Sequence, residues 1–296
     1  MSYLDDEADI EKSRAPLMAH LVELRKRLII CVAALVIGLI ACFSFAKEIY
    51  LFLLQPYQTA STLMAAQHLA GKHGSFDLLL ALLHIRTMPG AVAQDVKFVF
   101  TGPLEFFFAK LKLAGFGAIV ITFPVIAFQL YRFVAPGLYR RERKAFLPFL
   151  IAAPILFIAG AALVYFIILP FVLWFALSQQ IVGANHVSVE LLPKVSDYLS
   201  LVTTLLLAFG LCFQLPIVLS LLGLAGILTS KQLISFWRYA IVAIVALAAV
   251  VTPPDIISQI TLSIPLCLLY AVSILCVWLI ERGKAKEEAA QDLANI

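Results

Sequence analysis

The chain has 296 residues, of which 62% are hydrophobic and only 14% are charged. One water-soluble core of this size cannot hide so many apolar side chains, so the composition excludes a soluble globular protein and predicts a chain that has a bilayer as its solvent. The net charge of +4 would suit a nucleic-acid-binding protein. The cations, however, gather beside the apolar runs, where membrane orientation explains them and no nucleic acid is needed.

Six continuous apolar runs are predicted to be membrane-spanning helices. They lack the alternation of β-barrel strands, and a lipid-exposed backbone must satisfy its own hydrogen bonds. The fifth run is too short to cross a full-thickness bilayer comfortably, and Pro253 and Pro254 separate it from the sixth. The expected fold is an all-α membrane protein with six transmembrane helices. The runs cover residues 28–46, 111–133, 147–177, 198–224, 237–251 and 256–280.

The Lys and Arg residues of the short flanking segments predict the orientation. They concentrate in both tails and in the loops after the second and fourth runs, whereas the loop after the third run has only Lys194. Because cytoplasmic segments carry the excess of cations, both termini are expected in the cytoplasm. Three parts follow: a cytoplasmic tail with an amphipathic segment (1–27), the transmembrane domain (28–280) and a second cytoplasmic tail (281–296). Residues 50–110 are expected to form a long first loop on the outer side.

The sequence has no motif for catalysis. It contains no phosphate-binding GxxxxGK[ST], no HExxH and no nucleophile elbow. The cysteines lie within predicted spans, where packing explains them, and the histidines are scattered. We therefore expect a binding or transport protein rather than an enzyme, with no cofactor and no metal. A secondary transporter is the alternative, although the chain lacks the internal repeat and the midplane charges of that class.

Two acidic residues stand out in the segments expected at the cytoplasmic edge. Glu23 lies beside Arg25, Lys26 and Arg27, and Glu142 lies among the cations of the loop after the second run. Two fixed carboxylates would suit a ligand with adjacent guanidinium groups, because each carboxylate can take a bidentate arginine. The alternative is local: a Glu23–Arg27 pair along one helix, and charge balancing by Glu142.

Polar residues in or next to the last spans form a second group. Gln214 is the clearest polar residue within a span, and its amide either joins two helices by a hydrogen bond or has a functional role. Asp255 follows the two prolines and is placed to cap the sixth helix, with Gln259 one turn later. Thr252 and Gln259 make a polar spot suited to hydrogen bonding with a partner helix in lipid.

At these motifs the chain resembles the TatC family, the multispanning receptor subunits of the twin-arginine protein translocase. Pro56 after the first run and Glu105 before the second also fit, the latter within Gly102-Pro103-x-Glu105, whereas residues 63–94 match no family motif. The four main matches are Leu21-x-Glu23-Leu24-Arg25-x-Arg27, Phe133-x-x-Pro136-x-x-Tyr139-x-x-Glu142-Arg143, Phe213-Gln214-x-Pro216 and Thr252-Pro253-Pro254-Asp255-x-x-Ser258-Gln259.

The resemblance implies a concave six-helix bundle in the bacterial cytoplasmic (inner) membrane that takes part in the export of folded proteins. It implies that the site for the twin-arginine signal peptide comprises Glu23, Arg25, Phe133 and Glu142, and Arg25 would orient Glu23 or meet lipid headgroups. The family often carries glutamate where Gln214 stands, and glutamine cannot supply a charge.

Partners are implied in the same way. The fifth and sixth spans would dock the single-span proteins TatA and TatB, and copies of the subunit would associate within the complex. The residues expected at the docking face are Ala249, Thr252, Asp255 and Gln259.

Overall fold

The computed structural model describes residues 17–70, 98–134, 140–184, 187–189, 192–251 and 256–294. These residues are almost all helical, apart from a short antiparallel hairpin of strands β1 (Ile181–Ala184) and β2 (Val187–Val189). The helices are α2 (Leu17–Ser44), α3 (Ala46–Ala70), α5 (Glu105–Val134), α6 (Arg140–Leu163), α7 (Leu169–Ser178), α8 (Val195–Cys212), α9 (Leu215–Leu224), α10 (Ser230–Ser235), α11 (Trp237–Val251) and α12 (Ile256–Ala294).

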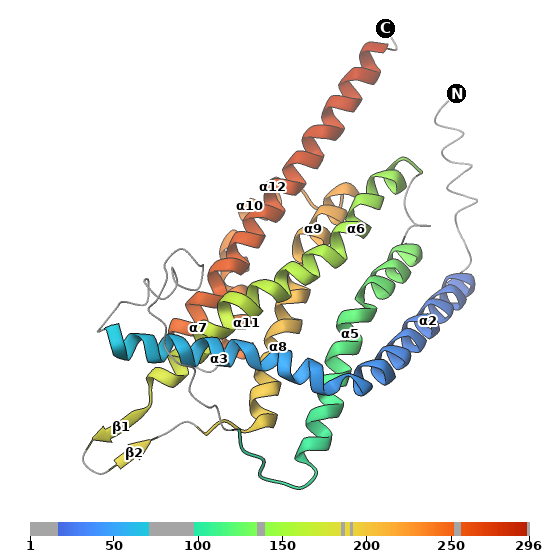
Figure 1. Ribbon diagram of the computed structural model, residues 1–296. Coiled ribbons are helices and arrows are strands. Elements are labelled where there is room, and N and C mark those ends of the chain that lie inside the picture. Colours follow the sequence, from blue (N-terminus) through green and yellow to red (C-terminus); the bar gives the residue numbers. More distant parts are fainter. Residues whose placement is uncertain are drawn as a thin grey trace.

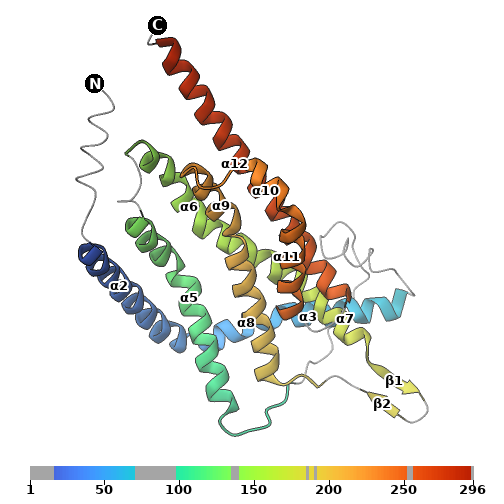
Figure 2. The same ribbon diagram turned by 180° about the vertical axis from the view of Figure 1, so that it is seen from behind.

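The helices form one bundle with two distinct sides (Figure 1). The start of α2, the end of α5, the start of α6 and the end of α12 lie together, and we call this the termini side. Helix α3 runs crosswise at the opposite side, near the start of α8 and the hairpin, and we call this the α3 side (Figure 2). Within the described ranges, five helical segments are long and apolar enough to cross a membrane, and Trp237–Val250 is a shorter one. The predicted all-α membrane fold is confirmed.

Two spans are continuous although they contain breaks. Between α6 and α7 the chain makes a π-helical turn, η2 (Val164–Ile168), in which the Leu169 N–H donates to the Val164 carbonyl. The adjacent Pro170 has no N–H to donate, so the helix changes its hydrogen-bond register there. Helices α8 and α9 meet at Gln214, two residues before Pro216. Both pairs nevertheless act as single spans, Pro148–Ser178 and Val195–Leu224.

Helix α3 is the main departure from the expected layout. Residues 46–70 are helical, where the sequence predicts the end of the first run and the beginning of a long loop. Its hydrophobic side is narrow: Leu53, Tyr57 and Ala60 are buried at spacings of four and three, while their neighbours are partly polar. A stripe of this kind lies against other helices rather than spanning a bilayer. The expected short helix at 78–85 lies outside the described residues.

Small residues allow the spans to approach closely. Helix α2 packs along α5, and a Cβ added at Gly117 would lie 2.9 Å from the Cys42 sulfur. Between α6 and α8, a Cβ at Gly210 would lie 2.6 Å from the Phe157 ring, which is buried. Lipid is as apolar as a leucine side chain, so close packing of this kind replaces the hydrophobic effect as the force that joins helices in a membrane.

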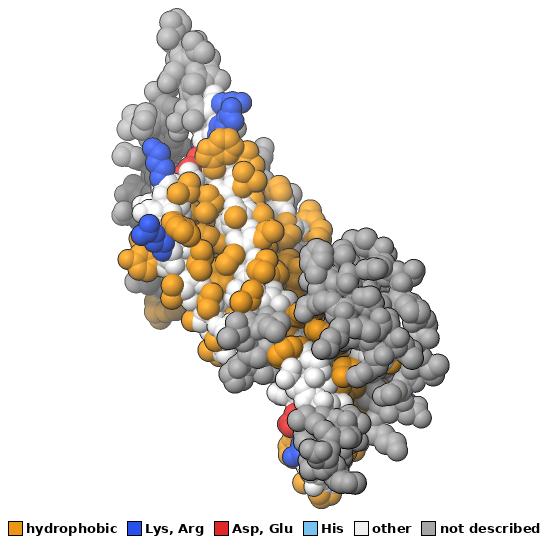
Figure 3. All heavy atoms as spheres, turned by 90° about the vertical axis from the view of Figure 1, so that its left-hand side faces the viewer, with side chains coloured by type: hydrophobic (Ala, Val, Ile, Leu, Met, Phe, Trp, Pro, Cys, Tyr) orange, Lys and Arg blue, Asp and Glu red, His pale blue; other side chains and the backbone are white. Residues whose placement is uncertain are grey.

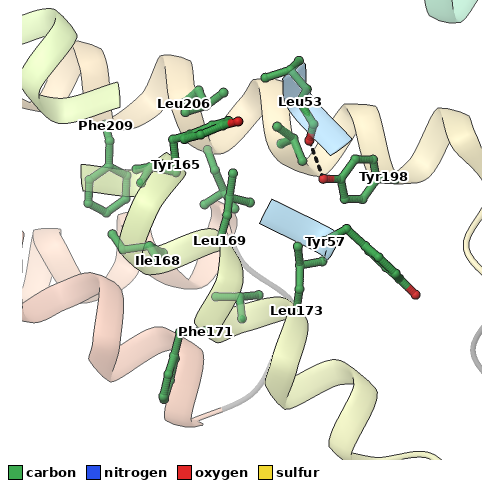
Figure 4. Close-up of a cluster of buried hydrophobic side chains, with 14 of the residues drawn as sticks. Leu53, Tyr57, Tyr165, Ile168, Leu169, Phe171, Leu173, Tyr198, Leu206 and Phe209 are labelled. Atoms are coloured by element: carbon green, nitrogen blue, oxygen red, sulfur yellow. Dashed lines mark hydrogen bonds between the residues drawn. The ribbon is translucent and has the colours of Figure 1, made fainter. Parts of the chain in front are cut away.

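The largest buried cluster lies where α3 meets η2, α7 and α8 (Figure 4). Leu53 and Tyr57 come from α3, Ile168 from η2, and Tyr198 and Leu206 from α8. Outside this cluster many large apolar side chains are exposed, and Figure 3 shows them as a broad band with Lys and Arg gathered toward one end. Such a band is the surface that a membrane protein presents to lipid.

Candidate functional site

Glu23 is held by a neighbour on its own helix. Its Oε1 atom accepts a charge-assisted hydrogen bond of 2.9 Å from Nη2 of Arg27, one turn further along α2. The two side chains are 33% and 21% exposed, so the pair lies partly out of water. The intrahelical pair predicted from the spacing is therefore present. Arg25, expected to orient Glu23 or to meet lipid headgroups, is exposed, and the arginine that contacts Glu23 is Arg27.

The same arginine reaches a second helix. Nη1 of Arg27 donates to Oε1 of Gln129 on α5 at 3.3 Å, and Gln129 is only 8% exposed. Phe133 lies four residues beyond Gln129 on α5 and is half-buried. Residues four apart on a helix share a face, so Phe133 follows Gln129 on the same side of α5. The structure thus brings Glu23, Gln129 and Phe133 to the termini side.

Glu142 belongs to the first turn of α6, which begins at Arg140. The start of α6 lies on the termini side together with the end of α5 and the start of α2 (Figure 2). The backbone therefore places Glu142 on the same side of the bundle as Glu23. Pro136 and Tyr139, which belong to the same motif, lie outside the described residues. Gln129 belongs to none of the sequence motifs, and its only sequence signal is an amide within an apolar run.

Pro56 has a structural partner on another span. A proline cannot donate to the carbonyl four residues earlier, so the Phe52 carbonyl loses its usual helical partner. The Tyr165 hydroxyl replaces it, donating to Phe52 O at 2.7 Å, and the Gln55 side-chain oxygen lies 3.0 Å from the same hydroxyl. The Phe52 and Tyr165 rings stack with centroids 4.5 Å apart. A kinked α3 is thereby fixed to the π-helical turn.

A second tyrosine holds α3 from the other direction. The Tyr198 hydroxyl donates to the Leu53 carbonyl at 2.6 Å (Figure 4). Its ring contacts Tyr57 and Phe98, with centroids 5.8 Å and 5.2 Å away. Burial raises the pKa of the Tyr57 hydroxyl in α3 above its ordinary value, so this group stays neutral. Two spans, through one hydroxyl each, therefore hold successive carbonyls of α3.

Glu105 fixes the start of α5. Its Oε2 accepts from the backbone N–H of Thr101 at 2.7 Å and of Gly102 at 3.3 Å, as in a helix capping box. Its Oε1 accepts from the Ser196 hydroxyl at 2.6 Å, on the second residue of α8. The carboxylate thus determines where α5 begins and joins it to α8. The sequence predicts the importance of Glu105 from its motif but not Ser196.

Gln214 makes a hydrogen bond between two helices, which is one of the two roles expected for it. Its Nε2 donates to the Ala153 carbonyl of α6 at 3.0 Å. The amide lies at the junction of α8 and α9, where Pro216 interrupts the helix. Its position agrees with a role in holding the broken span against α6.

The expected docking face is exposed in part. Ala249 on α11 is exposed, and Gln259 on α12 is half-buried, with its Nε2 donating to the Val245 carbonyl at 3.2 Å. That bond joins α12 to α11. Thr252 and Asp255 lie outside the described residues. Among the described residues, no three His, Cys, Asp or Glu side chains come together as a metal site requires.

Comparisons with known proteins agree with this architecture. A family model described as "Sec-independent protein translocase protein (TatC)" matches residues 19–265. The TatC protein of Magnetococcus marinus is 37% identical over 284 residues, which is 96% of this chain and 91% of that protein. The TatC protein of Aquifex aeolicus is 34% identical over 278 residues, which is 93% of this chain and 100% of that protein.

A solved structure agrees as well. The crystal structure of a twin-arginine translocase receptor TatC superposes with a TM-score of 0.67 at 34% identity, over 88% of this chain and 99% of that one. The match therefore extends to sequence and fold over nearly the whole described bundle. The chain belongs to the TatC family of Sec-independent protein translocase proteins.

Proposed function

We propose that this translocase subunit binds twin-arginine signal peptides at the termini side, through the carboxylates of Glu23 and Glu142 and the ring of Phe133. As a TatC family member the chain is a multi-pass membrane receptor and not an enzyme. The observation that carries the proposal is the arrangement of Glu23: its carboxylate is fixed by Arg27, next to Gln129 and the Phe133 turn of α5. A fixed carboxylate can accept a guanidinium in one plane, and an aromatic ring beside it can stack on the arginine.

The test is cross-linking of a signal peptide to membranes that contain Glu23→Ala or Glu142→Ala at equal subunit abundance. Loss of one charge-assisted contact, worth about 1.5–3 kcal/mol, lowers affinity by about 10- to 150-fold. Glu48→Ala is the matched control, because Glu48 is an exposed acid in the first turn of α3 on the opposite side. If both variants cross-link as well as the control, neither carboxylate belongs to the site.

The proposed orientation puts the termini side in the cytoplasm of a bacterial inner membrane. The support is the concentration of Lys and Arg in the segments of that side. A reporter that is active only in the cytosol should work when it is fused after Lys286. Activity there of a reporter that requires export would reverse the orientation.

The proposed partners are single-span proteins of the TatA and TatB type, docked on α11 and α12, with copies of the subunit associating in the complex. The support is a short, largely exposed α11 on which Ala249 is exposed and the Val245 carbonyl, one turn earlier, accepts from Gln259. Cysteine at either position should cross-link to a cysteine in the partner span. Cysteine at Ile40 of α2, which is 65% exposed, is the control. Cross-links from Ile40 alone would place the docking face elsewhere.

A further inference from the structure

Arg27 divides its guanidinium between two helices. Its Nη2 atom donates to Glu23, four residues earlier on α2. Its Nη1 atom donates to Gln129 on α5, which lies 102 residues further along the chain. The amide of Gln129 is buried, so its position is set by the packing of α5 against α2. Arg27 therefore fixes the position of the Glu23 carboxylate relative to α5, the helix that carries Phe133.

The arrangement has a cost that ordinary packing would avoid. The Nε atom of Arg27 is buried, and none of the side chains and backbone groups that the structure describes is its hydrogen-bond partner. Burying a guanidinium and an amide at a helix contact is often no more stable than apolar side chains of the same volume. Stability alone thus gives no reason for Arg27 and Gln129 at these positions, and what the pair does fix is the direction of one carboxylate.

We propose that Arg27 and Gln129 are positioning residues, which hold the Glu23 carboxylate in one plane so that the site distinguishes a guanidinium from an ammonium. The inference rests on the proposed function of Glu23 in binding the signal peptide. A guanidinium is planar and donates along fixed directions, so it gains from a carboxylate of fixed orientation. An ammonium is a compact charge with rotatable donors, and it binds a freely rotating carboxylate nearly as well.

The bond to Arg27 leaves room for the ligand. Nη2 of Arg27 contacts one carboxylate oxygen, Oε1, and an ionised carboxylate accepts about four hydrogen bonds. Oε2 and the second lone pair of Oε1 therefore remain available to both N–H groups of an incoming guanidinium fork. Fixing the side chain beforehand also removes part of the ordering cost of binding.

The experiment compares two signal peptides, one with paired arginines and one with paired lysines, cross-linked to membranes that contain the complete translocase. The ratio of the two cross-linking yields is the readout, because a loss of folding or of abundance lowers both yields and leaves their ratio unchanged. Gln129→Met has the same length but no acceptor, and it should lower the arginine-to-lysine ratio about 3- to 10-fold, the effect of one hydrogen bond. Gln129→Glu keeps the acceptor and should keep the ratio, although its charge raises both affinities.

Three outcomes decide the matter. A wild-type ratio in Gln129→Met, or an equal loss of ratio in Gln129→Glu, overturns the proposal. If Gln129→Met does not accumulate, Arg27→Lys takes its place: one ammonium cannot hold both partners in a fork, so the ratio should fall, and an unchanged ratio overturns the proposal. Glu23→Ala distinguishes failure of the proposed function from failure of the positioning role. If Glu23→Ala binds the arginine peptide normally, the proposed function of Glu23 is wrong. If Glu23→Ala loses binding but Gln129→Met keeps the wild-type ratio, only the positioning role is wrong.

Discussion

The two sides of the bundle are held together in different ways. At the α3 side, Tyr165 and Tyr198 are 6% and 5% exposed, and their hydroxyls join separate spans to α3 by bonds of 2.7 Å and 2.6 Å. At the termini side, α2 is joined to α5 by a longer bond of 3.3 Å from a partly exposed arginine. The α3 side is thus joined by the hydroxyls of two buried tyrosines, and we expect the loss of either hydroxyl to cost more stability than the loss of the partly exposed Glu23 at the proposed peptide site.

The largest expected loss of stability comes from a single hydroxyl at the α3 side. Tyr165→Phe removes the hydroxyl of a buried tyrosine that donates to the Phe52 carbonyl, which the helix itself cannot satisfy because residue 56 is proline, and should cost about 1–3 kcal/mol. Tyr198→Phe also removes a bond to α3, but the Leu53 carbonyl has the N–H of Tyr57 four residues on, so the cost is about 0.5–1.5 kcal/mol. The midpoint of thermal unfolding in detergent measures both. Tyr239→Phe, at a 73% exposed ring, is the control and should change nothing. Equal losses in the two buried variants would contradict the role assigned to Pro56.

A second prediction concerns a variant that restores the backbone N–H which Pro56 lacks. In a Pro56→Ala background, the N–H of residue 56 can bond to the Phe52 carbonyl, so Tyr165→Phe should cost less by about 0.5–1.5 kcal/mol. The four proteins form a double-mutant cycle. Pro56→Ala with Tyr198→Phe gives the matched cycle, in which we expect little coupling. Additive losses in the Tyr165 cycle would show that the hydroxyl does not substitute for the proline's absent N–H.

The third prediction concerns Glu105. Glu105→Gln keeps the size of the side chain but has only one oxygen, which cannot accept from both Ser196 and the Thr101–Gly102 backbone. The unfolding midpoint should fall by less than in Tyr165→Phe, because this group is partly in water. Ser196→Ala, which removes one of the bonds, should produce part of the same effect, and its effect should disappear in the Glu105→Gln background.

The smallest stability effect is expected at the termini side. Glu23→Ala removes a partly exposed (i, i+4) pair while Arg27 keeps its bond to Gln129, so it should lower stability by only about 0.2–0.5 kcal/mol, whereas signal-peptide binding falls strongly. Unfolding midpoints and cross-linking on the same membranes give the two quantities. A loss of stability as large as that of Tyr165→Phe would remove the contrast between the two sides.

The sequence predicts the apolar spans well because long hydrophobic runs are a direct consequence of the bilayer. The predicted fifth run coincides with α11. Helix α5 begins six residues before the predicted second run, at Glu105, whose carboxylate accepts from the backbone just before the helix. Helix α3 is not predicted, because it spans nothing and its stripe of Leu53, Tyr57 and Ala60 is interrupted by a proline. The hydroxyl of Tyr165, on a distant span, supplies the hydrogen bond that this proline cannot donate.

Part of the proposed site follows from the sequence as well. The Glu23–Arg27 pair follows from helical spacing, since residues four apart meet on one face. The contact with Gln129 depends on how α2 crosses α5, and no local pattern encodes a partner 102 residues away. The contribution of Ser196 to Glu105 is hidden for the same reason, across 91 residues.

The tyrosine that completes α3 has a consequence for how the chain is made. Tyr165 follows Phe52 by 113 residues and Tyr198 follows Leu53 by 145. A ribosome that adds about 5–20 residues per second takes roughly 5 to 25 seconds to reach Tyr165 after Phe52 has been synthesised. During that interval α3 has a carbonyl that its own helix cannot satisfy, and water at the membrane surface is the available donor. Helix α3 therefore reaches its final place only after the third and fourth spans have emerged, so a helix that is made early is among the last to be fixed.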